Sequence, residues 1–472
     1  MEYKNDKSEF IAFAEAGLGD EKRASIDVCL ERVTKAVDEK FLTARAEQYR
    51  TDAKSDNELK EAFGKLAVIC NEKEQDCAKC PVNKYCNTYI ENARAGVNDK
   101  SLKMIDLFCG AGGLSLGFTQ EGFITSLAND IQDCCVDTYA HNHPETPRDH
   151  IVLGDIKDVV ENLDAFLAGR NVDIVVGGPP CQGFSMANRQ RLIDDPRNYL
   201  YKSYVEVVEK VRPGFFVMEN VKGMLSVAEQ VKEDFRNIGY SVECHVLNAK
   251  DFGVPQNRER LIYIGNCIGI DNEQIFKEIF ELSKSIPEHN LGDALYALRE
   301  LEASRIKNAT EAGSEESGYK IEKNNILDTN DYITYINQGR MVPVVSNHKA
   351  RYNNDRDIEI FGRMEPGDRS DDPKIADIMP YARRNDIFKD KYFKLENDKV
   401  CKTITAHMKF DCNMYIHPTQ ARGLTPREAA RVQSYPDDYF FRGAYTKTYM
   451  QIGNSVPPLL GRAIAQVIKK YM

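Results

Sequence analysis

Cys181 stands in a rigid sequence setting that favours a reactive thiol. It directly follows the segment GGPP at residues 177–180, in which two prolines fix the direction of the chain. An apolar run at 173–176 precedes this segment, and α/β sheets bind ligands at the carboxyl ends of such strands. A thiolate is a competent nucleophile, and a helix that begins just after it lowers the thiol pKa. Free cysteines are more often small buried hydrophobes, but the glycine and proline flanks favour the nucleophile.

One glutamate and two arginines lie at the ends of other apolar runs, where they could reach the same ligand site. Glu219, followed by Asn220, ends the apolar run at 215–218, and a glutamate beside a cleft can donate a proton when burial raises its pKa. Arg258 and Arg260 lie in the segment QNRER; guanidinium groups suit phosphates and the oxygen atoms of base edges. The alternative is structural, because arginine and glutamate also form ion pairs that hold a fold together.

A glycine-rich turn follows the first apolar run. Residues 104–108 lead into CGAGG, where Gly110 and Gly112 let the backbone turn tightly and approach a ligand. Asp130 and Asp155 end two later runs, and a carboxylate in such a place commonly binds ribose hydroxyls. The spacing suits a methyl donor better than a dinucleotide. A plain tight turn and two helix caps are the structural alternatives.

Four of the 13 cysteines are crowded near the start, in the pattern C-x6-C-x2-C-x5-C; they are Cys70, Cys77, Cys80 and Cys86. Four thiolates can hold an iron–sulfur cluster or a zinc ion. Zinc sites usually show two C-x2-C pairs, and only one such pair is present here. We therefore expect an iron–sulfur cluster, with zinc as the alternative.

The elements that must position these residues indicate an α/β fold. From residue 103, short apolar runs alternate with helical segments, which predicts a mostly parallel sheet covered on both faces. Residues 1–68 have helical periodicity, and the pattern becomes irregular and charged from about 266 to 422. We predict a helical module with the four cysteines at 1–100, a catalytic domain at 101–267 plus 422–472, and a smaller domain at 268–421.

Composition alone does not identify the substrate. The net charge of −10 argues mildly against nucleic acid, because phosphate binding needs local positive potential. Basic residues nevertheless cluster at 382–394 and 340–351. The start of the chain is polar, and no apolar run approaches the roughly 20 residues that span a bilayer. These features predict a cytoplasmic protein.

Six segments resemble, in order, the blocks of the bacterial DNA (cytosine-5-)-methyltransferase family. They are MIDLFCGAGGLSLGF at 104–118, GGPPCQGFS at 177–185, ENVKGM at 219–224, QNRERLIYIG at 256–265, GLTPREAARVQSYPDDY at 423–439 and QIGNSVPP at 451–458. The resemblance implies a Rossmann-like S-adenosylmethionine-dependent methyltransferase domain and, at 268–421, an irregular target-recognition domain. It also implies methyl transfer to carbon 5 of a flipped-out cytosine in a specific duplex sequence, as part of a restriction–modification system.

The resemblance implies a role for each matching residue. Cys181 would attack carbon 6 of cytosine, and Glu219, supported by Asn220, would contact ring nitrogen 3. Arg260 would hold the base at its O2 atom, while Arg258 would lie near the backbone. The implied contacts to S-adenosylmethionine are Phe108, Gly110 and Gly112 at the methionine part, Asp130 at the ribose, Asp155 and Ile156 at the adenine, and Pro180, Asn454, Ser455 and Val456 around the site.

The cysteine pattern at the front resembles the iron–sulfur loop of endonuclease-III-like DNA glycosylases, without any glycosylase active-site motif beside it. One alternative is a transfer-RNA methyltransferase with the same chemistry, although the long late insert favours a DNA enzyme. A DNA-binding protein with an inactive site is disfavoured by the intact Cys181, Glu219 and glycine loop. An iron–sulfur repair protein does not explain residues 103–472. We expect double-stranded DNA as the partner, a separately acting restriction endonuclease, and action as a monomer. The recognition sequence cannot be read from these residues.

Overall fold

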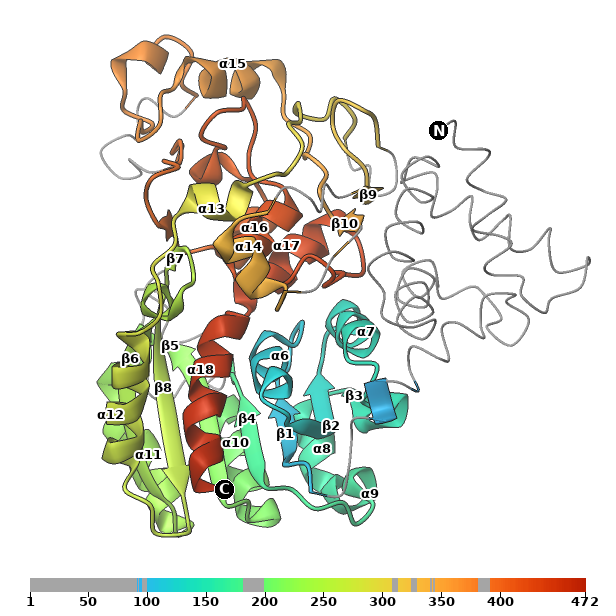
Figure 1. The fold of residues 1–472 in the computed structure, drawn as a ribbon, viewed down its shortest axis with the longest axis vertical. Coiled ribbons are helices and arrows are strands. Elements are labelled where there is room, and N and C mark those ends of the chain that lie inside the picture. Colours follow the sequence, from blue (N-terminus) through green and yellow to red (C-terminus); the bar gives the residue numbers. More distant parts are fainter. Residues whose placement is uncertain are drawn as a thin grey trace, which may run out of the picture.

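The computed structural model describes residues 91, 93–95, 100–180, 199–307, 313–323, 329–339, 342, 344–380 and 391–472. Two groups of predicted site residues lie outside these ranges. One is Cys181, and the other is the set Cys70, Cys77, Cys80 and Cys86. Figure 1 shows a sheet flanked by helices in the lower part of the molecule and a cluster of short helices above it.

A seven-stranded sheet in the order β3-β2-β1-β4-β5-β8-β6 forms the lower part. Its strands are β1 (Lys103–Leu107), β2 (Ile124–Asp130), β3 (Ile151–Leu153), β4 (Ile174–Gly177), β5 (Phe215–Val221), β6 (Ser241–Asn248) and β8 (Glu259–Asn266). All neighbours are parallel except at β8, which runs antiparallel to both β5 and β6. The predicted mostly parallel α/β sheet is confirmed, and the reversed β8 makes it mixed.

Successive residues of the central strands point to opposite faces of the sheet, and each face has its own core. Met104 and Ile174 belong to the cluster under one helical layer, whereas Ile105 and Val175 belong to the cluster on the other side. All of these side chains are fully buried. Burial on both faces explains why the strands read as continuous apolar runs rather than as an alternating pattern.

Helices cover both faces. The helices of the lower part are α6 (Gly113–Gln120), α7 (Asp133–Asn142), α8 (Ile156–Glu161), α9 (Leu163–Leu167), α10 (Tyr199–Val211), α11 (Ala228–Asn237), α12 (Asn272–Ser283) and α18 (Pro458–Ile468). The first face is covered by α6, α12 and α18, and the second by α8, α10 and α11. The C-terminal α18 lies against α6, directly after the glycine turn, so the end of the chain returns to the predicted ligand loop.

The upper part is built from short elements. They are α13 (Leu291–Leu295), α14 (Asp331–Ile336), α15 (Asp355–Arg363), α16 (Pro426–Val432), α17 (Tyr445–Asn454), the ribbon of β9 (Ile321–Lys323) and β10 (Val344–Ser346), and the pair of β7 (Gln256–Asn257) and β11 (Cys401–Lys402). The α16 and α17 helices lie here beside α13 and α14 (Figure 1). By contrast, α12 packs on the sheet with α18.

Buried arginines of α16 hold the upper part together. Arg431 forms an ion pair with Asp437 and donates to the carbonyl of Tyr296, at distances of 2.6 and 2.7 Å. Arg427 donates to the carbonyls of Ser346 and Pro436. Because each guanidinium satisfies backbone groups from segments distant in sequence, this helix organises loops that have little regular structure of their own.

None of the helices in the described ranges is long and apolar enough to cross a membrane.

Candidate functional site

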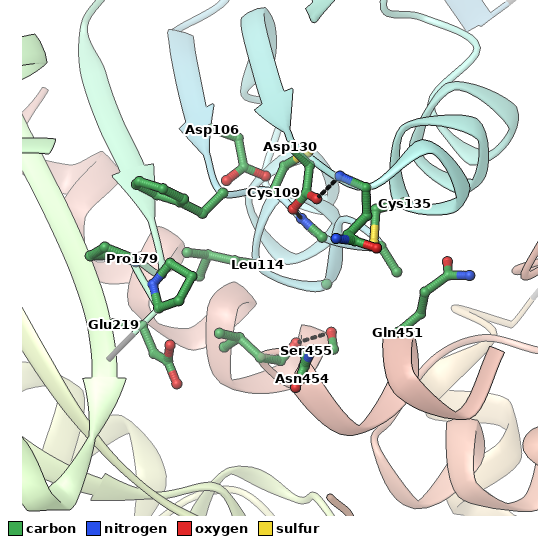
Figure 2. Close-up of a pocket in the computed structure, with 18 of the residues that line it drawn as sticks. Asp106, Cys109, Leu114, Asp130, Cys135, Pro179, Glu219, Gln451, Asn454 and Ser455 are labelled. Carbon is green, nitrogen blue, oxygen red and sulfur yellow. Dashed lines mark hydrogen bonds between the residues drawn. The ribbon is translucent and has the colours of Figure 1, made fainter. Parts of the chain in front are cut away.

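A cavity of about 760 Å³ opens at the carboxyl ends of the central strands. Of the predicted site residues, those that line it are Phe108, Gly110, Asp130, Asp155, Ile156, Pro180, Glu219, Asn220, Arg258, Arg260, Asn454, Ser455 and Val456. Figure 2 shows Asp130 and Cys135 on one side of the cavity and Pro179 and Glu219 on the other, with Asn454 and Ser455 between them at a third wall. Segments from six strands and the end of α17 thus converge on one space.

The glycine turn holds the carboxylate of Asp130. The N–H of Gly110 donates to Asp130 Oδ2 at 2.9 Å, and the N–H of Gln132 donates to Oδ1 at 2.7 Å. Gly110 has φ of 54°, in the left-handed region that glycine adopts readily. Burial raises the pKa of Asp130. Its oxygens keep lone pairs that can accept hydroxyl groups of a ligand.

Gly112 does not line the cavity, although it was predicted to contact the cofactor. It precedes α6 with φ of 78°, and a Cβ here would lie 2.8 Å from His143 Nε2 and 2.9 Å from the Tyr439 hydroxyl. The glycine is therefore required for close packing beneath the turn. The sequence pattern does not distinguish a glycine that faces a ligand from one that faces the protein.

Asp155 both caps a helix and lines the cavity. Its Oδ1 accepts the N–H of Lys157 at 2.9 Å at the start of α8. The next residue, Ile156, is buried at the same wall. The cap was the structural alternative for this aspartate, and it fixes the carboxylate at the rim without removing it from the cavity.

Glu219 and Arg260 form an ion pair on the opposite wall. Arg260 Nε lies 2.7 Å from Glu219 Oε1, and the two residues stand on the neighbouring strands β5 and β8. Gly178 approaches the same carboxylate, since a Cβ there would lie 2.9 Å from Glu219 Oε2. A carboxyl group and a guanidinium side by side can bind the polar edge of a flat heterocycle, one atom each.

Asn220 connects this wall to the segment that carries Cys181. Its Nδ2 donates to the carbonyl of Pro179 at 3.0 Å, and its Oδ1 accepts the N–H of Val221 at 2.9 Å. The side chain is buried. The end of β5 and the proline turn after β4 are therefore held together, two residues before Cys181.

Arg258 is fully buried and clamps backbone carbonyls. Its guanidinium donates to the carbonyls of Ile404, Gly453 and Ser455 at 2.7, 3.1 and 2.8 Å. Burial lowers the pKa of Arg258. The arginine thus ties the strand leading to Arg260 to the loop after α17 that lines the cavity.

Asp106 is a buried cavity residue that sequence reasoning missed. Its carboxyl group accepts the hydroxyl of Ser115, and burial raises the pKa of Asp106 to about 7. The thiols of Cys109 and Cys135 line the same wall, and burial raises the pKa of Cys109. An acid within an otherwise apolar strand, MIDL, is the signal that could have identified Asp106.

Comparisons with known proteins agree with this arrangement. Residues 102–470 match the family described as C-5 cytosine-specific DNA methylase. The chain is 36% identical to the type II methyltransferase M1.HphI of Haemophilus parahaemolyticus, over 78% of this chain and 87% of that protein. It is 33% identical to the type II methyltransferase M.AgeI of Thalassovita gelatinovora, over 78% of this chain and 99% of that one.

Among solved structures, the chain is similar to an Escherichia coli protein encoded within a prophage and described as a DNA modification methyltransferase. The two are 25% identical with a TM-score of 0.61, over 78% of this chain and 99% of the other.

Proposed function

This chain belongs to the family of C-5 cytosine-specific DNA methylases, and from that premise we propose how its residues divide the work. The protein is a DNA cytosine-5 methyltransferase that uses S-adenosylmethionine as methyl donor and double-stranded DNA as substrate. Its similarity to type II methyltransferases fits the modification half of a restriction–modification system. A target base inside a duplex is out of reach of a cavity wall, so the cytosine must be flipped out of the stack.

In the proposed reaction, the Cys181 thiolate adds to carbon 6 of the flipped cytosine while Glu219 holds ring nitrogen 3. The pair of electrons displaced from the 5,6 double bond makes carbon 5 nucleophilic. After methylation, loss of the carbon-5 proton and expulsion of the thiolate restore the ring. Cys181 lies outside the described residues, and the support comes from its neighbours: Asn220 holds Pro179 beside Glu219.

The pairing of Glu219 with Arg260 is the observation that carries this proposal. In cytosine, nitrogen 3 is bonded to carbon 2, which carries O2, so the two polar atoms lie side by side on one edge of the base. A carboxyl group can donate to nitrogen 3 and a guanidinium can donate to O2, so the pair matches that edge. The pairing also orients both side chains before the base arrives, which lowers the cost of binding it.

The remaining walls suit S-adenosylmethionine. The carboxylates of Asp130 and Asp155 line one end of the cavity, where ribose and adenine polar groups would be bound. Phe108, Pro180 and the loop Asn454–Val456 would enclose the rest of the molecule. The cavity volume of about 760 Å³ lies within the range of small-molecule pockets. When bound, S-adenosylmethionine supplies an electrophilic methyl group.

Methyl transfer from tritiated S-adenosylmethionine tests the function directly. We expect label in duplex DNA as 5-methylcytosine and none in bulk transfer RNA. Cys181→Ser should abolish the label, whereas Cys267→Ser, at an exposed cysteine far from the cavity lining, should leave it unchanged. Label in transfer RNA alone would mean that the substrate is transfer RNA, with the same methyl-transfer mechanism. Folded wild-type protein that labels neither nucleic acid would refute the proposal.

We also propose that Cys70, Cys77, Cys80 and Cys86 hold an iron–sulfur cluster, with zinc as the alternative. The support is their spacing alone, since they lie outside the described residues. A metal in this module, residues 1–100, would serve as a structural staple or a DNA-docking element. Metal analysis and visible absorption of protein purified without oxygen separate iron from zinc, and the absence of both would reject the cluster.

We further propose how the chain is divided into domains. Residues 101–267 plus 422–472 would form the catalytic domain and residues 268–421 the target-recognition domain, although α12 packs on the sheet and α16 and α17 pack in the upper part. We propose that the protein acts as a monomer in the bacterial cytoplasm, with a restriction endonuclease that acts separately.

A further inference from the structure

Phe410 is an aromatic side chain exposed to solvent at the end of a short helix whose start adjoins the proposed active site. It is 65% exposed, the largest value among the bulky apolar side chains of the described residues. Folded proteins bury most phenylalanines, whereas the ring of this one is open to contact by a ligand. Phe410 directly follows the short 3-10 helix η9 (Ala406–Lys409).

The backbone at Phe410 is held by a partly buried arginine. Arg351 donates to the carbonyl of Met408 at 2.7 Å and to the carbonyl of Phe410 at 2.9 Å. Its guanidinium carbon lies 5.7 Å from the centre of the Tyr449 ring. The aromatic ring is therefore presented from a rigid support rather than from a free loop, which reduces the entropy lost when the ring meets a ligand.

The segment that leads to Phe410 lies against β7, which directly precedes the strand that carries Arg260. Thr403 donates its hydroxyl to the carbonyl of Asn257 at 2.6 Å, and the N–H of Ile404 donates to Gln256 Oε1 at 2.7 Å. Arg258 donates to the carbonyl of Ile404 from the other side. The start of η9 adjoins the cavity wall, because a Cβ on the cavity-lining Gly453 would lie 2.2 Å from the backbone nitrogen of Ala406. Phe410 follows at the other end of this short helix.

The immediate neighbours of the ring are a lysine and a histidine. The Lys409 ammonium lies 4.8 Å from the ring centre, and the exposed His407 imidazole lies 5.3 Å from it. One acid, Asp411, lies near this group, at 3.9 Å from His407 Nε2. A flat apolar surface bordered by a cation is the combination that proteins use to contact bases while neutralising nearby phosphates.

We propose that Phe410 contacts a base of the target duplex close to the flipped cytosine, with Lys409 placed at the adjoining phosphates. This inference rests on the proposed function, because it takes duplex DNA as the occupant of the surface. An apolar side chain can pack on a thymine methyl group or against the face of an unstacked base. The ring would thereby help to set the sequence that is methylated, as well as the affinity.

The test compares Phe410→Ala with Phe280→Ala, the latter at a 39% exposed phenylalanine on α12. The methylated sequence is first determined by bisulfite sequencing of random duplexes treated with the wild-type protein. Duplexes of that sequence then give the DNA dissociation constant and kcat/KM, and the KM for S-adenosylmethionine is measured in parallel. Melting temperatures of all three proteins check that the variants fold.

Phe410→Ala should weaken DNA binding about five- to a hundredfold, the range for losing one base–aromatic contact, with an unchanged KM for S-adenosylmethionine. It should also relax the sequence preference at one position beside the methylated cytosine. Phe280→Ala should behave as wild type. Equal affinity and equal sequence preference in Phe410→Ala, with an active wild type, would overturn this contact alone. A wild-type protein that neither binds nor methylates DNA would overturn both this contact and the proposed function.

Discussion

Arg260 Nε lies 2.7 Å from Glu219 Oε1, and the pair links the neighbouring antiparallel strands β5 and β8. The reversed strand brings Arg260 to the end of the sheet at which Glu219 stands, so a carboxylate and a guanidinium meet at the carboxyl end of the parallel strands. Together they form one wall of the cavity. Each residue orients the other, and each keeps donors or lone pairs for a base.

Glu219→Gln tests whether this carboxyl group takes part in the reaction. Glutamine has nearly the same shape but cannot exchange a proton with ring nitrogen 3, so we expect kcat to fall about 10²- to 10⁴-fold. The KM for S-adenosylmethionine should change little, because its proposed contacts lie on the other walls. Steady-state methylation of duplex DNA at varied concentrations of S-adenosylmethionine provides both values. A variant with normal kcat would show that Glu219 is only a structural partner of Arg260.

Gly178→Ala tests the placement of the same carboxylate. A Cβ at residue 178 would lie 2.9 Å from Glu219 Oε2, closer than side-chain atoms tolerate, so Glu219 must shift. A displacement of a catalytic group by about 1 Å can lower a reaction rate about 10²-fold. Gly362→Ala, where a Cβ would meet nothing within 4 Å, is the matched control and should keep full activity. Equal activity of the two variants would argue against a strict position for Glu219.

The sequence predicted the central strands of the sheet better than the edge strand β6. Apolar runs that end in Gly, Pro or a polar residue located β1, β4 and β5, because strands buried on both faces leave a continuous apolar signal. The edge strand β6 was missed, since SVECHVLN mixes polar and apolar residues and most of its side chains are only partly buried.

Long-range contacts were not readable from the sequence. The cofactor contact of Gly112 stays a prediction, and the sequence did not show that a Cβ at this position would meet Tyr139, His143 and Tyr439. Asp106 was missed, because only the folded chain shows that this acid faces a cavity. The placement of α16 above the sheet depends on which buried carbonyls its arginines reach, and no local pattern encodes that choice.

Asp106 should make stability depend on pH. Burial raises the pKa of Asp106 from 3.8 to about 7, so the folded state binds a proton more tightly than the unfolded state. Stability from this group is present below the unfolded pKa and is lost as pH rises towards 7. Between pH 5 and pH 8 the loss is about 3 kcal/mol.

Asp106→Asn removes that titration. Denaturant unfolding of wild type and variant at pH 5 and pH 8 isolates it from other groups. The variant should gain about 3 kcal/mol relative to wild type as the pH rises. An identical pH dependence in the two proteins would mean that Asp106 is not protonated in the folded state near neutral pH.

Arg431→Met should unfold the protein more easily. The change leaves Asp437 as a buried carboxylate without its ion pair and leaves the carbonyl of Tyr296 without that donor. Breaking a buried pair from one side costs about 3–5 kcal/mol. Arg305→Met, in an exposed pair with Asp355, should change stability by less than about 1 kcal/mol. Denaturant midpoints compare the two, and similar small losses would contradict the scaffold role of α16.

Arg258→Lys tests how the segment before β8 is held against the loop after α17 at the cavity wall. Arg258 reaches the carbonyls of Ile404, Gly453 and Ser455 at once, which one ammonium at the end of a flexible chain cannot do. The loop that lines the cavity with Asn454 and Ser455 should then lose its fixed position.

Losing one hydrogen bond from a charged group costs about 1.5–3 kcal/mol, so the KM for S-adenosylmethionine should rise roughly 10- to 100-fold in Arg258→Lys. Because the guanidinium of Arg258 is already engaged by the carbonyls of Ile404, Gly453 and Ser455, the DNA dissociation constant and its dependence on salt should change little. A reduced salt dependence of DNA binding with an unchanged KM for S-adenosylmethionine would instead assign Arg258 to a phosphate, since each lost phosphate contact lowers the slope by about one.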